Sequence, residues 1–194
     1  MAMKESVEAL LKPRTKDLGG FDVHRILPGY PIKKVGTFVF FDHMGPTTFA
    51  PGAGMDVRPH PHIGLATVTY LFEGTITHRD SIGSVQDISP CDVNWMTAGA
   101  GIVHSERTSA QERIVGTRLD GIQTWVGLPK AHERSAPAFG HRSTIDVAGD
   151  NRARRHDNGY RGPILWTASS YAHLKRNVLR CRGNGVRRHL HLPG

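Results

Sequence analysis

The sequence predicts an all-β domain, either a sandwich or a closed barrel. Short runs of β-branched and aromatic residues recur at intervals of roughly 8–12 residues, and glycine and proline separate them. No long segment repeats its apolar residues with the period of a helix. The chain has 194 residues, of which 38% are hydrophobic and 22% charged, so it can bury a core without disulfide or metal cross-links.

The first half of the domain is expected to contain three strands. They cover residues 21–27, 35–44 and 65–72. Pro28-Gly29 ends the first strand and Gly45-Pro46 ends the second, because both pairs favour turns. Residues 51–59 are rich in turn-forming residues and predict a loop.

The second half is expected to contain four more strands. They cover residues 75–81, 93–97, 102–107 and 121–128. Ile82-Gly83 marks a turn after the first of these strands, and the run AGAG separates the second from the third. Pro129 ends the last strand, since proline cannot continue the ladder of a central strand.

The net charge of +8 comes from the C-terminal end of the chain. Residues 1–150 carry 15 Lys and Arg against 16 Asp and Glu, whereas residues 151–194 carry 10 Lys and Arg against one acid. We therefore expect a folded domain over 1–148 and an atypical basic segment over 149–194. That segment is a poorly ordered tail, a truncated or out-of-frame remnant of a second domain, or an arm that binds nucleic acid or another acidic partner. Nucleic acid is not an expected partner of the main domain.

Nothing in the sequence indicates a membrane protein or a secreted one. No apolar run approaches the roughly 20 residues of a membrane span. The first residues lack the apolar core and cleavage site of a secretory signal. Cys91 and Cys181 lie far apart and make no disulfide framework. We expect a cytoplasmic protein with no membrane partner.

Two pairs of polar residues have the spacing of ligands on neighbouring strands. His60 and His62 are two residues apart, as are His104 and Glu106. Residues i and i+2 of a strand point to the same face, so each pair can direct two side chains into one barrel interior. Three imidazoles and one carboxylate suit a divalent metal and leave coordination positions open for catalysis. A histidine taken alone is more often a surface or core residue than a metal ligand.

Longer motifs resemble the pirin family of the cupin superfamily. The strings FDHMGP, HPHIGLATVTYLFEG, THRDSIGS and DVNWMTAGAGIVHSER resemble pirin sequences, and Gly54 followed by His60-x-His62 resembles the first cupin motif. The resemblance covers roughly residues 14–139. It implies a cupin (jelly-roll) β-barrel with one divalent metal, usually Fe(II), although Mn, Ni, Cu and Zn suit such ligands as well. Carried over position by position, it implies that the metal ligands are His60, His62, His104 and Glu106.

The sequence departs from the pirin pattern at several places. Ala66 stands where many cupins carry a glutamate, so Glu106 has to supply the carboxylate. Cys91 replaces the glycine of a Pro-Gly-Asp turn, and if that turn needs a positive φ, the cysteine is strained by about 1 kcal/mol or more. Ala100 replaces an arginine that many relatives have, and residues 149–194 do not resemble the second cupin domain that pirins carry.

The resemblance implies alternative functions. Some pirins cleave the flavonol quercetin with O2, which implies a quercetin 2,3-dioxygenase that acts on a flavonol-like small molecule, with Glu106 as catalytic base. Other pirins act without catalysis, as iron-binding transcriptional co-regulators or modulators of a partner protein. Both functions use the same four ligands, so the sequence leaves the choice open. A third hypothesis is a defective pirin with no activity.

Further polar pairs surround the predicted ligands. His78 and Asp80 could contact a metal ligand without binding the metal themselves. We expect instead a strand end followed by an Asp-stabilised turn. Asp42 and His43 predict either an acceptor for a ligand histidine or, as we expect, a loop-capping pair. Trp125 is expected to pack in the core.

Overall fold

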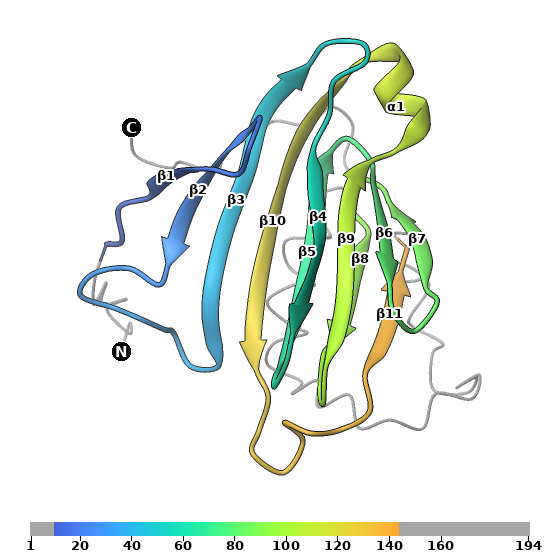
Figure 1. The fold of residues 1–194 in the computed structure, drawn as a ribbon. Coiled ribbons are helices and arrows are strands. Elements are labelled where there is room, and N and C mark those ends of the chain that lie inside the picture. Colours follow the sequence, from blue (N-terminus) through green and yellow to red (C-terminus); the bar gives the residue numbers. More distant parts are fainter. Residues whose placement is uncertain (1–9, 144–194) are drawn as a thin grey trace, which may run out of the picture. The chain divides into compact units, whose positions relative to one another are not determined.

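Residues 10–143 are described by the computed structural model, and they form two β-sheets that face each other (Figure 1). The larger sheet has the strand order β1 (Arg14–Asp17), β2 (Asp22–Leu27), β3 (Phe38–Phe49), β10 (Thr117–Gly127), β5 (Leu65–Glu73), β8 (Val93–Thr97) and β11 (Ala138–Arg142). The smaller sheet has the order β4 (Asp56–His62), β9 (Ile102–Thr108), β6 (Ile76–Asp80) and β7 (Val85–Ile88). The prediction of an all-β domain is confirmed. The boundary expected near residue 148 and the basic segment 149–194 lie outside the described residues.

The predicted end of the second strand is wrong, because Gly45-Pro46 forms a bulge and not a turn. Met44 pairs with Gly121 and Thr47 pairs with Leu119, so β3 uses three residue steps where β10 uses two. Gly45 has a φ of +84°, and a Cβ atom there would lie 2.2 Å from the carbonyl oxygen of Leu119. Glycine is therefore required at the bulge, and the strand continues beyond it.

The predicted loop over 51–59 is also too long, because β4 begins at Asp56. Asp56 already pairs with Arg107 on β9. Two prolines, Pro59 and Pro61, lie within β4. In a sequence, prolines argue against a strand, so the pattern predicts a loop. β4 is an edge strand of the smaller sheet, and an edge strand tolerates prolines because one side of its backbone has no ladder partner.

Helix α1 (Ala110–Val115) has a sequence signal that strand spacing alone does not reveal. Ser109 caps the helix and accepts a hydrogen bond from the backbone N–H of Glu112 at 3.3 Å, as in a capping box. The Glu112 side chain accepts a second bond from the backbone N–H of Thr75 at 2.7 Å and so ties the helix to the residue just before β6. Within residues 10–143, no helix is long and apolar enough to cross a membrane.

The apolar core fills the end of the domain near α1. Its buried residues come from both sheets and the segments beside them: Phe21, Val23, Met44, Phe49, Met55, Leu71, Ile76, Ile88 and Leu119. A smaller cluster of Met96, Ala98 and Ile102 lies elsewhere in the interior. Between them the interior contains buried polar side chains, among them Thr67, Thr69, Asn94 and His104. Buried polar groups need hydrogen-bond partners, so this region is where a site is expected.

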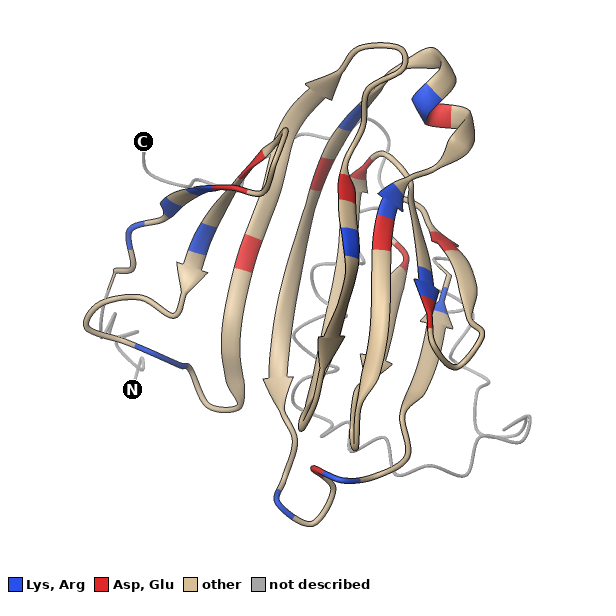
Figure 2. Ribbon diagram, in the orientation of Figure 1, with Lys and Arg blue, Asp and Glu red and all other residues tan. Residues whose placement is uncertain are grey.

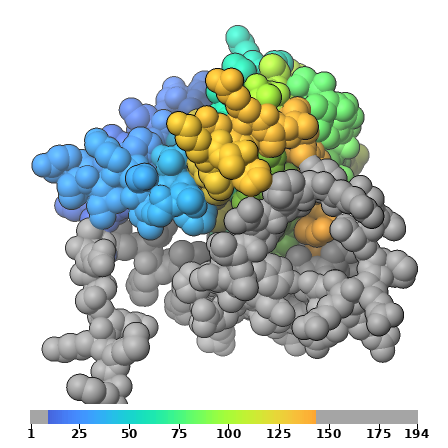
Figure 3. All heavy atoms as spheres, turned by 90° about the horizontal axis from the view of Figure 1, so that it is seen from below, coloured from blue at the N-terminus to red at the C-terminus, as the bar shows by residue number. Residues whose placement is uncertain are grey.

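Charged residues are unevenly distributed over the strands (Figure 2). Strand β8 carries none, and those of β10 lie near one end of the strand. At the opposite end of the domain from α1, the light-blue β2–β3 connection lies beside the gold residues that follow β10 (Figure 3). The backbone N–H of Gly127 donates to the carbonyl of Thr37 there, at 2.8 Å.

Cys91 is the only non-glycine residue with a positive φ within the described part of the chain, at +71°. Its backbone N–H donates to the carbonyl of Leu71 at 2.8 Å, which fixes the turn before β8 against β5. The turn therefore holds Cys91 in the left-handed conformation, which strains any residue that has a Cβ atom.

Candidate metal centre

The predicted ligand pairs lie on neighbouring antiparallel strands of the smaller sheet. His60 on β4 lies directly opposite His104 on β9, and Val57 lies opposite Glu106. His62 follows two residues after His60, and is buried with 8% of its surface exposed. His104 and Glu106 are 2% and 6% exposed. Both pairs therefore point toward the interior between the sheets.

A bulge in β4 sets this direction. From Val57 to His60 the strand uses three residue steps, whereas β9 uses two between Glu106 and His104. The two residues in the bulge, Arg58 and Pro59, are exposed. The residues that follow the bulge are thereby shifted by one position, which turns His60 and His62 inward.

Three imidazole rings meet at this point. The Nε2 atoms of His62 and His104 are 3.1 Å apart, and the ring centre of His60 lies 4.8 Å from that of His62 and 4.5 Å from that of His104. His60 donates its Nδ1–H to the carbonyl of Arg58 at 2.8 Å, so its Nε2 carries a lone pair. Nitrogen atoms this close fit two bonds of about 2.1 Å to one ion. The donor set therefore suits a divalent metal.

The carboxylate of Glu106 lies beside this group but is held by the other sheet. Gln123 on β10 donates to both of its oxygens, at 3.0 Å to Oε1 and 2.8 Å to Oε2. The hydroxyl of Thr69 on β5 donates to Oε1 at 3.2 Å. His60, His62 and His104 form one possible ligand group, whereas Glu106 forms another with His104 and His78.

Gln123 and Thr69 were not among the predicted site residues. Each lies on a strand of the larger sheet, and the two pair directly across β10 and β5. A glutamine among the apolar residues of GIQTWVG is the signal that was available in the sequence. The partner of a buried amide on another sheet cannot be read from strand spacing, because that spacing describes only one strand at a time.

Burial lowers the pKa of two of the histidines. The pKa of His62 falls to about 4, because burial disfavours its charged form and the neighbouring His104 and His60 add repulsion. Burial and repulsion from His60 and His78 lower the pKa of His104 to about 3. Both rings are therefore neutral at physiological pH, which is the state that binds a metal.

Behind His104 lies a second buried pair. His78 places its Nδ1 3.4 Å from Nδ1 of His104 and donates its Nε2–H to Oδ2 of Asp80 at 3.0 Å. Oδ1 of Asp80 accepts from the backbone N–H groups of Ile82 and Ser84, at 3.1 and 2.9 Å. Burial raises the pKa of Asp80, but these hydrogen bonds outweigh it, so the pKa lies below its usual value. The expected Asp-stabilised turn is present, and so is a contact with a predicted ligand.

The other polar pair lies away from the cluster. Asp42 accepts two hydrogen bonds from Arg25, both at 2.8 Å, and His43 bonds Asp120 at 2.8 Å. Both residues lie within β3. They therefore link neighbouring strands, and they neither support the histidine cluster nor cap a loop.

Trp125 lies beside the cluster. Its ring meets His62 edge-on, with centres 4.9 Å apart, and stacks on Phe40 at 3.9 Å. Its Nε1 atom is buried and has no hydrogen-bond partner among the described residues. The indole thus packs against Phe40 and borders the site at His62, with a buried N–H that no described residue accepts.

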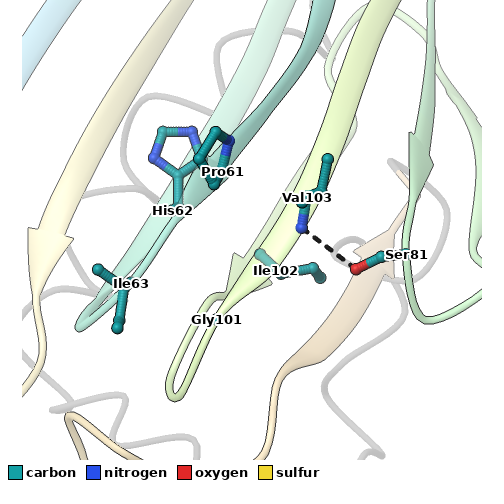
Figure 4. Close-up of a pocket in the computed structure, with 7 residues that line it drawn as sticks. All are labelled: Pro61, His62, Ile63, Ser81, Gly101, Ile102 and Val103. Atoms are coloured by element: carbon teal, nitrogen blue, oxygen red, sulfur yellow. Dashed lines mark hydrogen bonds between the residues drawn. The ribbon is translucent and has the colours of Figure 1, made fainter.

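A hollow of about 360 Å³ adjoins the cluster where β4 ends and β9 begins (Figure 4). Apart from His62, it is lined by Pro61, Ile63, Ser81, Gly101, Ile102 and Val103. Ser81 accepts a hydrogen bond from the backbone of Val103 at 3.1 Å, as Figure 4 shows. Of the lining residues, only His62 belongs to the histidine cluster, and the rest of the surface is mostly apolar.

The pirin family model matches residues 20–126, more than half of the chain. The chain belongs to the pirin family. A pirin-like protein of Caulobacter vibrioides is 56% identical over 137 residues, which cover 70% of this chain and 47% of that protein. This pirin therefore spans about half the length of that curated relative.

Crystal structures of two quercetin 2,3-dioxygenases from Acinetobacter baumannii resemble the fold. One is 43% identical with a TM-score of 0.63, and the match covers 67% of this chain and 42% of the dioxygenase chain. The other is 33% identical with a TM-score of 0.67, and the match covers 75% of this chain and 51% of the dioxygenase chain. The predicted cupin fold is confirmed over the described residues.

Proposed function

We propose that this pirin is a metal-dependent dioxygenase that cleaves a flavonol-like small molecule with O2, as a quercetin 2,3-dioxygenase does. The observation that carries the proposal is the meeting of three imidazoles, from His60, His62 and His104, beside the carboxylate of Glu106. The similarity to the two dioxygenase structures supports the substrate class. The cytoplasm is the compartment we expect.

The four side chains are proposed to hold one divalent metal, with Fe(II) expected and Mn, Ni, Cu or Zn suited to the same donors. Bound Fe(II) would supply open coordination positions and the redox chemistry needed to use O2. The neutral imidazoles contribute no charge, so Glu106 partly offsets the charge of the ion. Ala66 on β5 is fully buried and offers no second carboxylate.

Glu106 is proposed to accept the hydroxyl proton of the substrate. Its Oε1 already accepts from Thr69 and Gln123, whereas Oε2 accepts only from Gln123 in the described structure. Oε2 therefore has the lone pair available for a proton. The same two partners keep the carboxylate from rotating, which holds Oε2 in a fixed position.

Trp125 is proposed to orient the substrate. Its buried Nε1–H lacks a partner in the described structure, and a carbonyl oxygen of a flavonol would satisfy it. Its ring lies edge-on against His62, which places the indole beside the histidine cluster. An aromatic wall also favours stacking with a planar, aromatic substrate.

The test begins with metal content. The protein is loaded anaerobically with Fe(II), desalted and analysed for metal, next to His104→Ala and, as a matched control outside the cluster, His24→Ala. We expect about one equivalent in the parent and the control and little in His104→Ala. Aerobic incubation with quercetin should then bleach the flavonol absorbance, and Glu106→Gln should slow this strongly. Fully metallated parent that leaves quercetin and related flavonols intact would refute the dioxygenase.

Exposed apolar residues favour a second candidate, a regulator that binds a protein partner. Ile63 and Val103 are 69% and 43% exposed and border the same hollow. An exposed apolar patch of neighbouring residues often marks a contact surface. Under this alternative the metal acts as a redox switch, and partner capture depends on its oxidation state. If a variant that lacks all four metal ligands still captures the partner, the redox-switch alternative is refuted.

A further inference from the structure

A continuous line of buried groups leads from the histidine cluster to a carboxylate. It runs from His62 through His104 and His78 to Asp80, with heavy-atom separations of 3.1, 3.4 and 3.0 Å. His104 and His78 are 2% and 3% exposed, and the side chain of Asp80 is fully buried. Phe139 on β11 stacks on the His78 ring at 4.4 Å, which restrains the plane of that ring.

The hydrogen-bond partners fix which nitrogen carries each proton. An ionised Asp80 only accepts, so His78 carries a proton on Nε2, and its Nδ1 is the nitrogen that can accept. That nitrogen faces Nδ1 of His104, which must then carry the proton of that ring. Nε2 of His104 is left with a lone pair that faces the other two histidines.

We propose that His78 and Asp80 are positioning residues that hold His104 in the Nδ1–H tautomer and so keep its Nε2 available to a metal. The inference rests on the proposed metal centre for its purpose, but the tautomer itself is a property of the metal-free chain. Ligand histidines in metalloproteins characteristically donate their other N–H to an acceptor. Here the acceptor is a second histidine, which Asp80 in turn holds in the accepting state.

Asp80→Asn is the sharpest variant for this proposal. Two backbone N–H groups, from Ile82 and Ser84, bond the oxygen at the Oδ1 position, so the amide oxygen is expected to stay there. The amide nitrogen then faces His78 and donates to Nε2. His78 must carry its proton on Nδ1, and His104 must move its own to Nε2, the atom proposed to bind the metal.

Nitrogen-15 NMR of the imidazoles in metal-free protein measures the tautomers directly. We expect His104 as Nδ1–H and His78 as Nε2–H in the parent, and the reverse in Asp80→Asn. Asp87→Asn is the matched control, because Asp87 accepts from Thr77 on the same sheet without touching the histidines. An Nε2–H tautomer of His104 in the parent, or no change in Asp80→Asn, would overturn the proposal.

Affinity for Zn(II), a redox-inert probe, gives a second measurement. Asp80→Asn and His78→Leu should lose about 10–100-fold in affinity. His78→Asn should stay near the parent, because its amide oxygen can replace the accepting Nδ1. If His78→Asn loses Zn(II) affinity as completely as His104→Ala does, His78 is itself a ligand and its positioning role is overturned. Binding of two Zn(II) per chain would have the same meaning. A parent that binds no metal would refute the proposed centre, while the NMR result would still decide the tautomers.

Discussion

Gln123 donates hydrogen bonds to both carboxylate oxygens of Glu106, across the space between the two sheets. Gln123 belongs to β10 of the larger sheet and Glu106 to β9 of the smaller one. The proposed base is thus built on one sheet and held by the other. Its position depends on how closely the sheets approach each other.

Replacing Gln123 should therefore weaken both the fold and the site. In Gln123→Leu, the buried Glu106 carboxylate keeps only Thr69 as a described donor, which should cost about 1–3 kcal/mol of unfolding free energy. Metal affinity should fall about 10–100-fold, because a loosened ligand binds less well. Chemical denaturation and Zn(II) titration measure the two effects. Gln111→Leu, on the exposed surface of α1, is the control, and equal losses in both variants would contradict the assignment.

The metal-free protein should lose stability in acid. In the folded chain the pKa values of His62 and His104 lie at about 4 and about 3, below their usual value of 6.5. Below pH 6.5 the unfolded chain binds protons that the folded chain does not, so unfolding becomes easier as the pH falls toward 4. Each imidazole contributes up to about 1.4 kcal/mol per pH unit in this range and nothing above it. Denaturant unfolding at several pH values tests the slope, which should be shallower in His62→Gln. An unchanged slope in that variant would contradict the role of His62.

Cys91→Gly should stabilise the protein slightly. The φ of +71° strains the cysteine by about 1–2 kcal/mol, and glycine relieves that strain while losing about 0.5–1 kcal/mol to unfolded-state entropy. The net gain is expected to lie between about 0 and 1.5 kcal/mol. Cys91→Val should have the opposite effect, because a β-branched residue tolerates positive φ poorly. Thermal unfolding of the three proteins tests the order, and a valine variant as stable as the glycine variant would contradict it.

Trp125→Phe should weaken substrate binding while preserving the wall. Phenylalanine keeps an aromatic ring against Phe40 and His62 but removes the Nε1–H that is proposed to bind a substrate oxygen. Loss of one such hydrogen bond corresponds to about 1 kcal/mol, or roughly a fivefold rise in KM. Trp95→Phe is the control, since Trp95 donates to Thr97 on its own strand. Unchanged KM in the Trp125 variant would remove this residue from substrate recognition.

The sequence predicts the fold class and the strands beside the histidine pairs because both follow from local alternation. His60, His62 and His104 come together for the same reason, as neighbouring strands place i and i+2 residues on one face. The role of Gln123 is not predictable in this way, because it depends on which residues of two different sheets face each other. The bulge at Gly45-Pro46 is not predictable from the sequence, because a bulge and a turn use the same residues and only the pairing of β3 with β10 distinguishes them.

Asp80 shows a different limit. Its expected role in a turn is correct, since Oδ1 accepts from Ile82 and Ser84. Its second oxygen, which bonds His78, gives it a role behind His104 as well. The sequence presented these roles as alternatives, whereas a carboxylate has two oxygens and can perform both at once.

The bulge in β4 affects where insertions and deletions can occur during evolution. Because Arg58 and Pro59 together face one residue of β9, loss of either would restore a regular strand and leave both imidazoles of the H-x-H pair inside. Loss of Pro61, between the two histidines, would instead turn one of them outward. Related sequences are thus expected to vary in length just before His60 and to keep a fixed length from His60 to His62.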